Sequence, residues 1–158
     1  WPAFLVGVVG GASMVVMRML LQASGIELRF DPARLWATMV LVHGMTGQML
    51  GMVIHLIGSG AIAVIFAWFY QRLGARNHFW AWGLLGGAIL WLIAGVFMGI
   101  MPAIHAEIPE QRHGPGAFLI DYGTHEVIVF LIGHLMFGLV VGILYPLLHP
   151  RADTRSIT

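Results

Sequence analysis

The chain has 158 residues, of which 59% are hydrophobic and only 9% are charged. A soluble domain carries about 25% charged residues, so this composition excludes an ordinary water-soluble protein and indicates a chain surrounded mostly by lipid. The formal net charge of +1 argues against a nucleic-acid partner. The absence of cysteine excludes disulfides, thiolate-bound metals and iron–sulfur clusters.

Four segments are long and apolar enough to cross a bilayer as helices, because one span needs roughly 20 apolar residues. They are residues 4–21, 49–70, 79–101 and 127–148. We therefore predict an all-α fold, a four-helix transmembrane bundle that forms a single domain over residues 1–150, with a short polar tail at 151–158. Between the first two spans, Asp31 and Pro32 are typical of an N-cap and a first helical position, which predicts a short interfacial helix in the first outer loop.

The loops predict an orientation. The connection after the second span carries Arg72 and Arg76 and no acid, and the tail carries Arg151 and Arg155. Six of the seven acidic residues lie in the two other loops. Because arginine near span ends favours the cytoplasmic side, we predict a multi-pass protein of the bacterial inner (cytoplasmic) membrane with both termini in the cytoplasm.

The spans contain an internal repeat. GVVGGA begins at Gly7 in the first span and GLLGGA begins at Gly83 in the third, and nearly the same interval separates His55 from His134 in the other two spans. This pattern favours two tandem helical hairpins related by a pseudo-twofold axis along the membrane normal. Glycines four residues apart also predict close helix packing. These pairs are Gly7/Gly11, Gly47/Gly51, Gly83/Gly87, Gly95/Gly99 and Gly138/Gly142.

A family likeness is found in three stretches of the chain. They are GMVIHLIGSGAIAVIFAWFY, LIGHLMFGLVVGILYPLL and the GIMP that closes the third span. They resemble a family of small four-helix bacterial inner-membrane proteins that is classed as a domain of unknown function. The last helix is similar to that family's pattern G-H-L-[FY]-G-x-x-x-G-x-x-Y, with an extra residue between Leu135 and Phe137. The resemblance covers most of the chain. It implies the fold and the membrane location, and it implies no chemistry for any residue.

Arg18, His55 and His134 fall in one layer of the predicted outer leaflet, where an ionisable group is a functional-site hypothesis by default. Imidazole is a standard axial ligand of haem iron, so one hypothesis is a small b-type cytochrome with haem between His55 and His134 and with Arg18 paired to a propionate. Another tetrapyrrole held by one histidine is a variant. In the structural alternative, each histidine bonds a neighbouring helix, and Arg18 reaches lipid headgroups or Glu27.

A methionine set supplies a third hypothesis. Met45, Met49 and Met52 have the spacing that places them on one helical face with His55. Thioether sulfur and imidazole suit Cu(I), so these residues would form a copper-handling site if they faced the bundle interior. Methionine is also an adaptable packing residue, common on surfaces that accept partners.

Catalytic motifs are incomplete in this sequence. IGSG at residues 57–60 lacks the first glycine of a nucleophile elbow, and His125-Glu126 does not complete H-E-x-x-H. We therefore expect no catalytic activity of the chain's own. The leading prediction is an accessory or structural subunit that packs with other membrane protein subunits in a bacterial energy-converting or electron-transport complex, and the haem and copper hypotheses stay open.

Overall fold

A computed structural model describes residues 1–73, 78–108 and 113–148 of the chain; the predicted tail and Arg76 lie outside them. The described residues form helices and connecting loops. The elements are α1 (Pro2–Ala23), α2 (Pro32–Met39), α3 (Gly44–Arg72), α4 (Phe79–Gly99), α5 (Met101–Ile104), the 3-10 helix η1 (Ala117–Tyr122) and α6 (Thr124–Leu148). Helices α1, α3, α4 and α6 are long and apolar enough to cross a membrane. The predicted four-helix fold is therefore confirmed, and the chain is a multi-pass membrane protein.

Local sequence explains where the helices begin. Asp31 is the N-cap of α2, because its Oδ1 accepts a hydrogen bond from the backbone N–H of Arg34 at 3.1 Å, and proline occupies the first turn. The short helix predicted in this loop is confirmed. Helix α3 begins at Gly44, before the predicted residue 49, because hydropathy marks the apolar part of a helix and misses its polar first turn.

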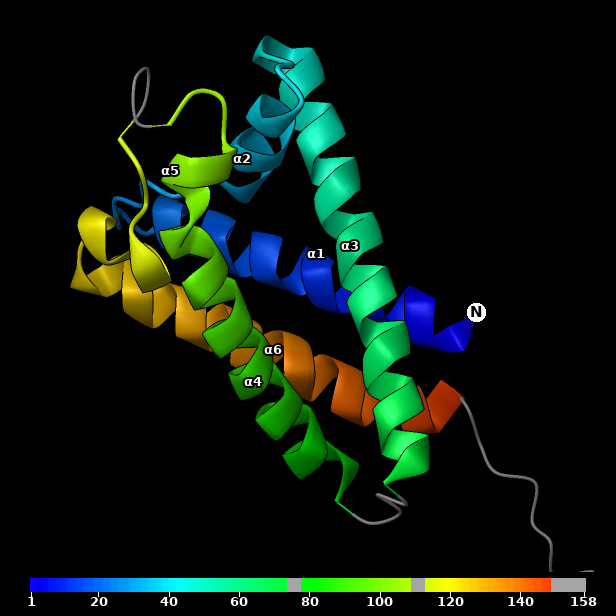
Figure 1. Ribbon diagram of the computed structural model, residues 1–158. Helices are drawn as coiled ribbons and strands as arrows, with labels where there is room; N and C mark the ends of the chain where they lie inside the picture. The colour runs from blue at the N-terminus through cyan, green and yellow to red at the C-terminus, as the bar shows by residue number, and fades with distance from the viewer. Residues whose placement is uncertain (74–77, 109–112, 149–158) are drawn as a thin grey trace, which may run out of the picture.

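The helices form two crossed pairs. Figure 1 shows α1 and α6 side by side and running in opposite directions, with α3 laid across α1 and α4 laid across α6. Helices α1 and α3 make the first hairpin, and α4 and α6 make the second. At one end of the bundle, Nε2 of Gln71 in α3 donates to the hydroxyl of Tyr145 in α6 at 2.6 Å. We call the opposite end, which carries α2, α5 and η1, the loop end.

The two hairpins pack at equivalent positions. A Cβ added to Gly7 would collide with Ala63 of α3, and a Cβ added to Gly83 would lie 2.9 Å from Cα of Gly142 in α6. The interval from Gly7 to Gly83 is that of the repeated glycine motif, and the interval from Ala63 to Gly142 is that of the two span histidines. The chain is therefore built from two similar hairpins.

Glycines of two further pairs make close contacts with elements of the loop end. Gly51 lies against the backbone of Ala33 in α2, and Gly95 lies against the ring of Phe118 in η1. In both places a side chain would displace the neighbouring element. The four-residue spacing of glycine thus marks close contacts throughout the fold, although not all of them join two membrane-spanning helices.

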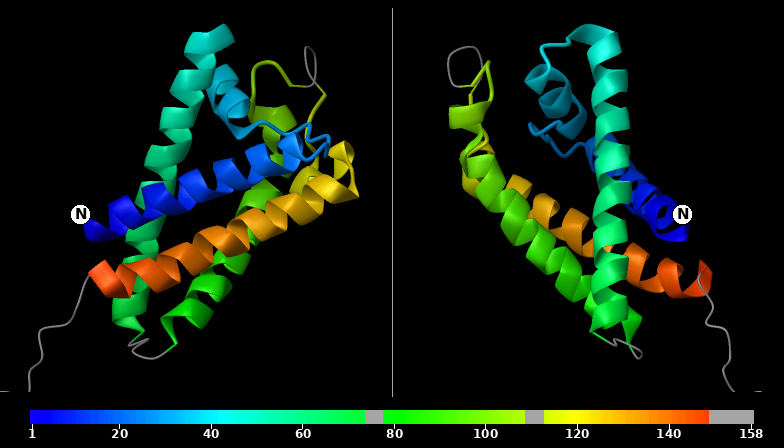
Figure 2. Two further views of the ribbon diagram at one scale, coloured as in Figure 1. Left: turned by 180° about the vertical axis from the view of Figure 1, so that it is seen from behind. Right: turned by 45° about the vertical axis from the view of Figure 1, so that its right-hand side comes forward.

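The twofold relation is incomplete. Helix α1 packs along α6, whereas α3 and α4 share almost no backbone contact over their described residues. They meet where the ring of Phe66 covers Gly86, and they diverge toward the loop end (Figure 2). There, Trp36 of α2 stacks on Phe97 of α4 with ring centroids 6.2 Å apart. Helix α2 thus lies between the diverging ends of α3 and α4 at the loop end.

Candidate functional site

A cavity of about 380 Å³ lies among α1, α3, α4 and α6, and both His55 and His134 line it. This volume falls within the range of small-molecule pockets, roughly 300–1,000 Å³. Most of the remaining lining is apolar, with the rings of Phe130 and Phe137 on the α6 side and Trp36 at the loop end. Two histidines that the sequence places in different spans therefore meet in one cavity.

We infer that the cavity opens between α3 and α4, the one neighbouring pair of its four helices without close backbone packing over the described residues. The other three sides are closed by the packed pairs α1 and α3, α1 and α6, and α4 and α6. The cavity is partly open to its surroundings, and α3 and α4 make almost no backbone contact along their described lengths. In a bilayer, this opening would face the acyl chains of the lipid.

His134 has one nitrogen that is held in place and one that lacks a partner. Its side chain is buried, and Nδ1 lies 2.7 Å from the carbonyl oxygen of Phe130, one turn earlier in α6. Because a carbonyl only accepts, Nδ1 must carry the proton, and Nε2 of the neutral ring then keeps its lone pair. Within the described part of the chain, Nε2 has no hydrogen-bond partner. Histidines that ligate metals are oriented in this way by a carbonyl at the other nitrogen.

His55 is oriented differently, although it is the equivalent residue of the first hairpin. Its Nε2 lies 3.4 Å from the carbonyl oxygen of Gly11 in α1, longer than the usual 2.7–3.2 Å for such a hydrogen bond. Since the carbonyl can only accept, Nε2 is the donor. His55 thus makes a weak contact between helices, as the structural hypothesis expects, and its Nε2 is directed at α1.

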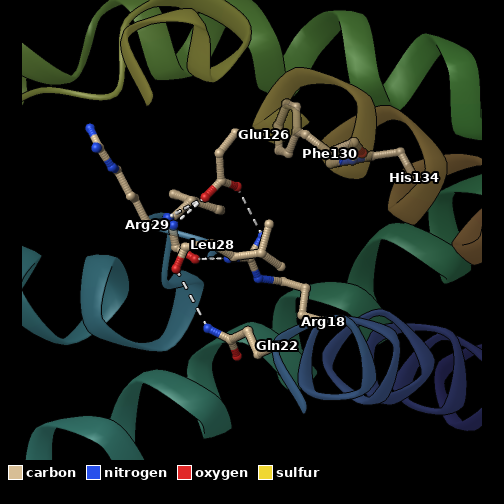
Figure 3. Close-up of polar contacts among 8 residues, drawn as sticks. Arg18, Gln22, Leu28, Arg29, Glu126, Phe130 and His134 are labelled. Carbon is tan, nitrogen blue, oxygen red and sulfur yellow. Dashed lines mark hydrogen bonds and ion pairs between the residues drawn. The ribbon is translucent and has the colours of Figure 1, made fainter. Parts of the chain in front are cut away.

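Arg18 lines the cavity at the loop end and is already paired. Its Nη1 donates to Oε2 of Glu126 at 3.2 Å, and its Nη2 donates to the carbonyl oxygen of Phe30. The carboxylate of Glu126 is fully buried, and its Oε1 accepts from the backbone N–H groups of Phe30, at 2.9 Å, and Arg29 (Figure 3). The structure therefore gives Arg18 a different partner from the propionate, headgroup or Glu27 predicted from the sequence.

This pairing leaves the cavity without a spare positive charge. Arg18 is the one charged side chain in the lining, as far as the chain is described, and Glu126 neutralises it. An anionic ligand would have to break the pair and lie beside a buried carboxylate, which is costly. The residues fit a tetrapyrrole held by His134 alone better than a bis-histidine haem, whose propionates would lack a cation here.

The predicted copper ligands do not converge. Met45 and Met49 are 77% and 66% exposed on α3, Met52 is half-buried, and none of the three lines the cavity with His55. Among the described residues, no group of three or more histidine, aspartate or glutamate side chains is placed to hold a metal ion. Three other methionines line the cavity instead: Met14, Met17 and Met98. The placement gives no support to the copper hypothesis.

A second group of polar side chains holds the loop end together. Nε2 of buried His105 lies 3.1 Å from Oγ1 of Thr38 in α2, and its Nδ1 accepts from the backbone N–H of Glu107 at 3.1 Å. Oε1 of Glu107 lies 2.5 Å from Nε2 of His43, next to the start of α3. These contacts join α2, α3 and the segment after α5. These contacts were not predicted from the sequence, in which Thr38 within an otherwise apolar stretch was the available signal.

Comparisons with known proteins give no functional assignment, since no family model, no curated protein and no solved structure matches the chain. The family resemblance noted from the sequence therefore stays a prediction. The function has to be inferred from the geometry of the cavity and its lining.

Proposed function

We propose that this protein holds an uncharged, lipid-soluble ligand in the cavity between its two hairpins. The observation that carries the proposal is the setting of His134, a buried side chain in the wall of an apolar cavity of about 380 Å³. Its Nε2 has no partner among the described residues, and it keeps a lone pair that can accept a hydrogen bond or bind a metal. A ligand that supplies a hydrogen-bond donor or a metal would gain that interaction.

Gly58 offers a direct way to test the proposal. It lines the cavity, and a Cβ added there meets nothing within 4 Å, so Gly58→Phe should fill the cavity without a backbone clash. The preceding residue, Ile57, is 55% exposed on the outer face of the same helix. Ile57→Phe is therefore a matched control that adds a ring outside the cavity.

The experiment compares the wild type and both variants after purification from native membranes. Each sample is extracted with organic solvent, and small molecules in the extracts are identified by mass spectrometry. We expect one lipid-soluble compound in stoichiometric amount in the wild type and in Ile57→Phe, and its loss in Gly58→Phe. Identical extracts from all three proteins would refute the proposal.

Haem b or another tetrapyrrole held by His134 alone is the second candidate, since the orientation of His134 favours an axial ligand, although the propionates of a haem would find no free cation in the cavity. The carbonyl at Nδ1 leaves Nε2 available as an axial ligand. A reduced-minus-oxidised visible spectrum of the purified protein tests this candidate. Soret and α bands that disappear in His134→Ala would support a haem, and a featureless wild-type spectrum would exclude it.

We also propose that the chain acts as an accessory subunit of a larger bacterial energy-converting or electron-transport complex, in the inner membrane with both termini in the cytoplasm. The small size of the chain and the arginines beside its spans support this proposal. Purification in a mild detergent, followed by identification of co-purifying membrane proteins, tests the subunit role. A chain that purifies alone from native membranes would contradict it.

A further inference from the structure

We infer that the ligand is a hydroquinone on a lipid chain, with one ring hydroxyl donating a hydrogen bond to Nε2 of His134. This inference rests on the proposed function, and it names the chemical class of the ligand. Four properties of the cavity lead to it: the hydrogen-bonding state of its buried histidine, the charge of its wall, its aromatic lining and the position of its opening.

The first property selects a hydrogen-bond donor. Because Nδ1 of His134 donates to the carbonyl of Phe130 at 2.7 Å, the neutral ring presents an acceptor at Nε2. A hydroxyl group can donate to that lone pair, whereas a carbonyl or an ether oxygen has no hydrogen to donate. The carbonyl of Phe130 belongs to the helix backbone, so it also holds the ring in this tautomer.

The second property excludes a charged ligand. Arg18 is neutralised by Glu126 at 3.2 Å and also donates a hydrogen bond to the carbonyl of Phe30, and over the described chain no other charged side chain lines the cavity. A phosphate or carboxylate would lose its hydration without gaining a cation. A hydroquinone carries no charge at neutral pH and still has two O–H donors.

The third property favours an aromatic ring. Phe130 lies edge-on to the imidazole of His134, with ring centroids 4.4 Å apart, and the rings of Phe137 and Trp36 also line the cavity. The methionines of α1 and α4 add polarizable sulfur, which makes favourable contacts with aromatic rings. A flat ring placed here would gain edge-to-face and sulfur contacts that an aliphatic alcohol lacks.

The fourth property provides for a lipid chain. The described residues of α3 and α4 share almost no backbone contact, which is the basis for placing the opening of the cavity between these two helices. A ring bound at His134 would leave a long chain free to extend through this gap into the acyl layer. The ligand could thus enter from the bilayer without crossing the loop end.

The test measures binding to the protein in nanodiscs of synthetic phosphatidylcholine by isothermal titration calorimetry, with empty nanodiscs subtracted. The probes are a decyl-substituted 1,4-hydroquinone, its oxidised quinone, which has acceptors only, and its dimethyl ether. In the wild type we expect the hydroquinone to bind roughly tenfold more tightly than the quinone, the size of effect expected for one hydrogen bond. The dimethyl ether should bind no better than the quinone.

Two variants connect this preference to the histidine. His134→Phe should abolish it, bringing the affinity ratio of hydroquinone to quinone close to one. Ile132→Phe, at a residue of α6 that is 48% exposed, should retain it. Equal binding of all three probes to the wild type would overturn the inference without any variant. A hydroquinone preference that survives in His134→Phe would also overturn it.

The outcomes separate this inference from the proposed function. If no probe binds, but the solvent extracts contain a compound that Gly58→Phe loses, the cavity holds another ligand and only the hydroquinone assignment is wrong. If no probe binds and the extracts of the three proteins are identical, both proposals fall.

Discussion

Arg18 of α1 and Glu126 of α6, 108 positions apart in the sequence, form an ion pair with 3.2 Å between Nη1 and Oε2. The carboxylate is fully buried and also accepts from backbone N–H groups in the connection between α1 and α2. A buried carboxylate is costly unless it is paired and hydrogen-bonded. The pair therefore fixes how α1, α6 and this connection lie at the edge of the cavity.

The first prediction concerns this pair. Glu126→Leu should leave the guanidinium of Arg18 without its carboxylate, and breaking a buried pair in this way typically costs about 3–5 kcal/mol. The double variant Arg18→Met/Glu126→Leu should lose clearly less than the sum of its single variants, because neither charge is then left alone. The measurement is a double-mutant cycle of unfolding free energies in detergent. Additive losses would show that the two residues do not interact.

The second prediction concerns the helix crossings. Gly7→Val and Gly83→Val should each lower stability, by about 1–3 kcal/mol or more, because overpacking a close contact forces the backbone to move. At Gly83, the added Cβ would meet Cα of Gly142 at 2.9 Å. Gly58→Val is the control, since open space surrounds it. Thermal unfolding of the three variants measures the stability that each one loses. An equal loss of stability in Gly58→Val would contradict the packing described.

A third prediction tests the polar contacts at the loop end. Thr38→Val keeps the shape of the side chain and removes the hydroxyl that lies 3.1 Å from Nε2 of His105. Nε2 of the buried imidazole would lose its partner while Nδ1 keeps its contact with the backbone N–H of Glu107, so we expect a loss of about 1–3 kcal/mol in unfolding free energy. Thr46→Val, at an exposed residue of α3, should be nearly neutral. Similar values for the two variants would argue against a stabilising role for this contact.

The fourth prediction tests the orientation in the membrane. The chain has no cysteine, so single cysteines can be introduced without background labelling. His78 and His113 are both exposed; His113 lies in the segment before η1, and His78 lies next to the start of α4. A membrane-impermeant maleimide should label His113→Cys in cells with an opened outer membrane, and should label His78→Cys only after the inner membrane is broken. The reverse pattern would place the termini outside the cytoplasm.

The sequence predicted the parts of the fold that depend on local chemistry. Apolar length located the four spans, because the bilayer fixes how long an apolar helix must be. Asp31 followed by proline located the start of α2, where the expected capping bond is present. The repeat around Gly7 and Gly83 indicated two similar hairpins, since the same spacing of small residues gives the same close contact.

The parts that depend on how the hairpins meet were not predictable. The pairing of Arg18 with Glu126 joins helices far apart in the chain, so the nearby Glu27 was the more natural partner in the sequence. The different contacts of His55 and His134 also arise from tertiary packing, because their sequence positions are equivalent. The exposure of Met45 could not be read from helical spacing, which says that residues share a face without saying what that face meets.

Native mass spectrometry of the protein released directly from bacterial membranes tests the central claim, a ligand held in the cavity, most directly. We predict an adduct of one small molecule on the wild type and on Ile57→Phe, and the bare protein mass for Gly58→Phe. A wild-type protein that always shows its bare mass, or an adduct that Gly58→Phe retains, would contradict a ligand-binding cavity between the hairpins.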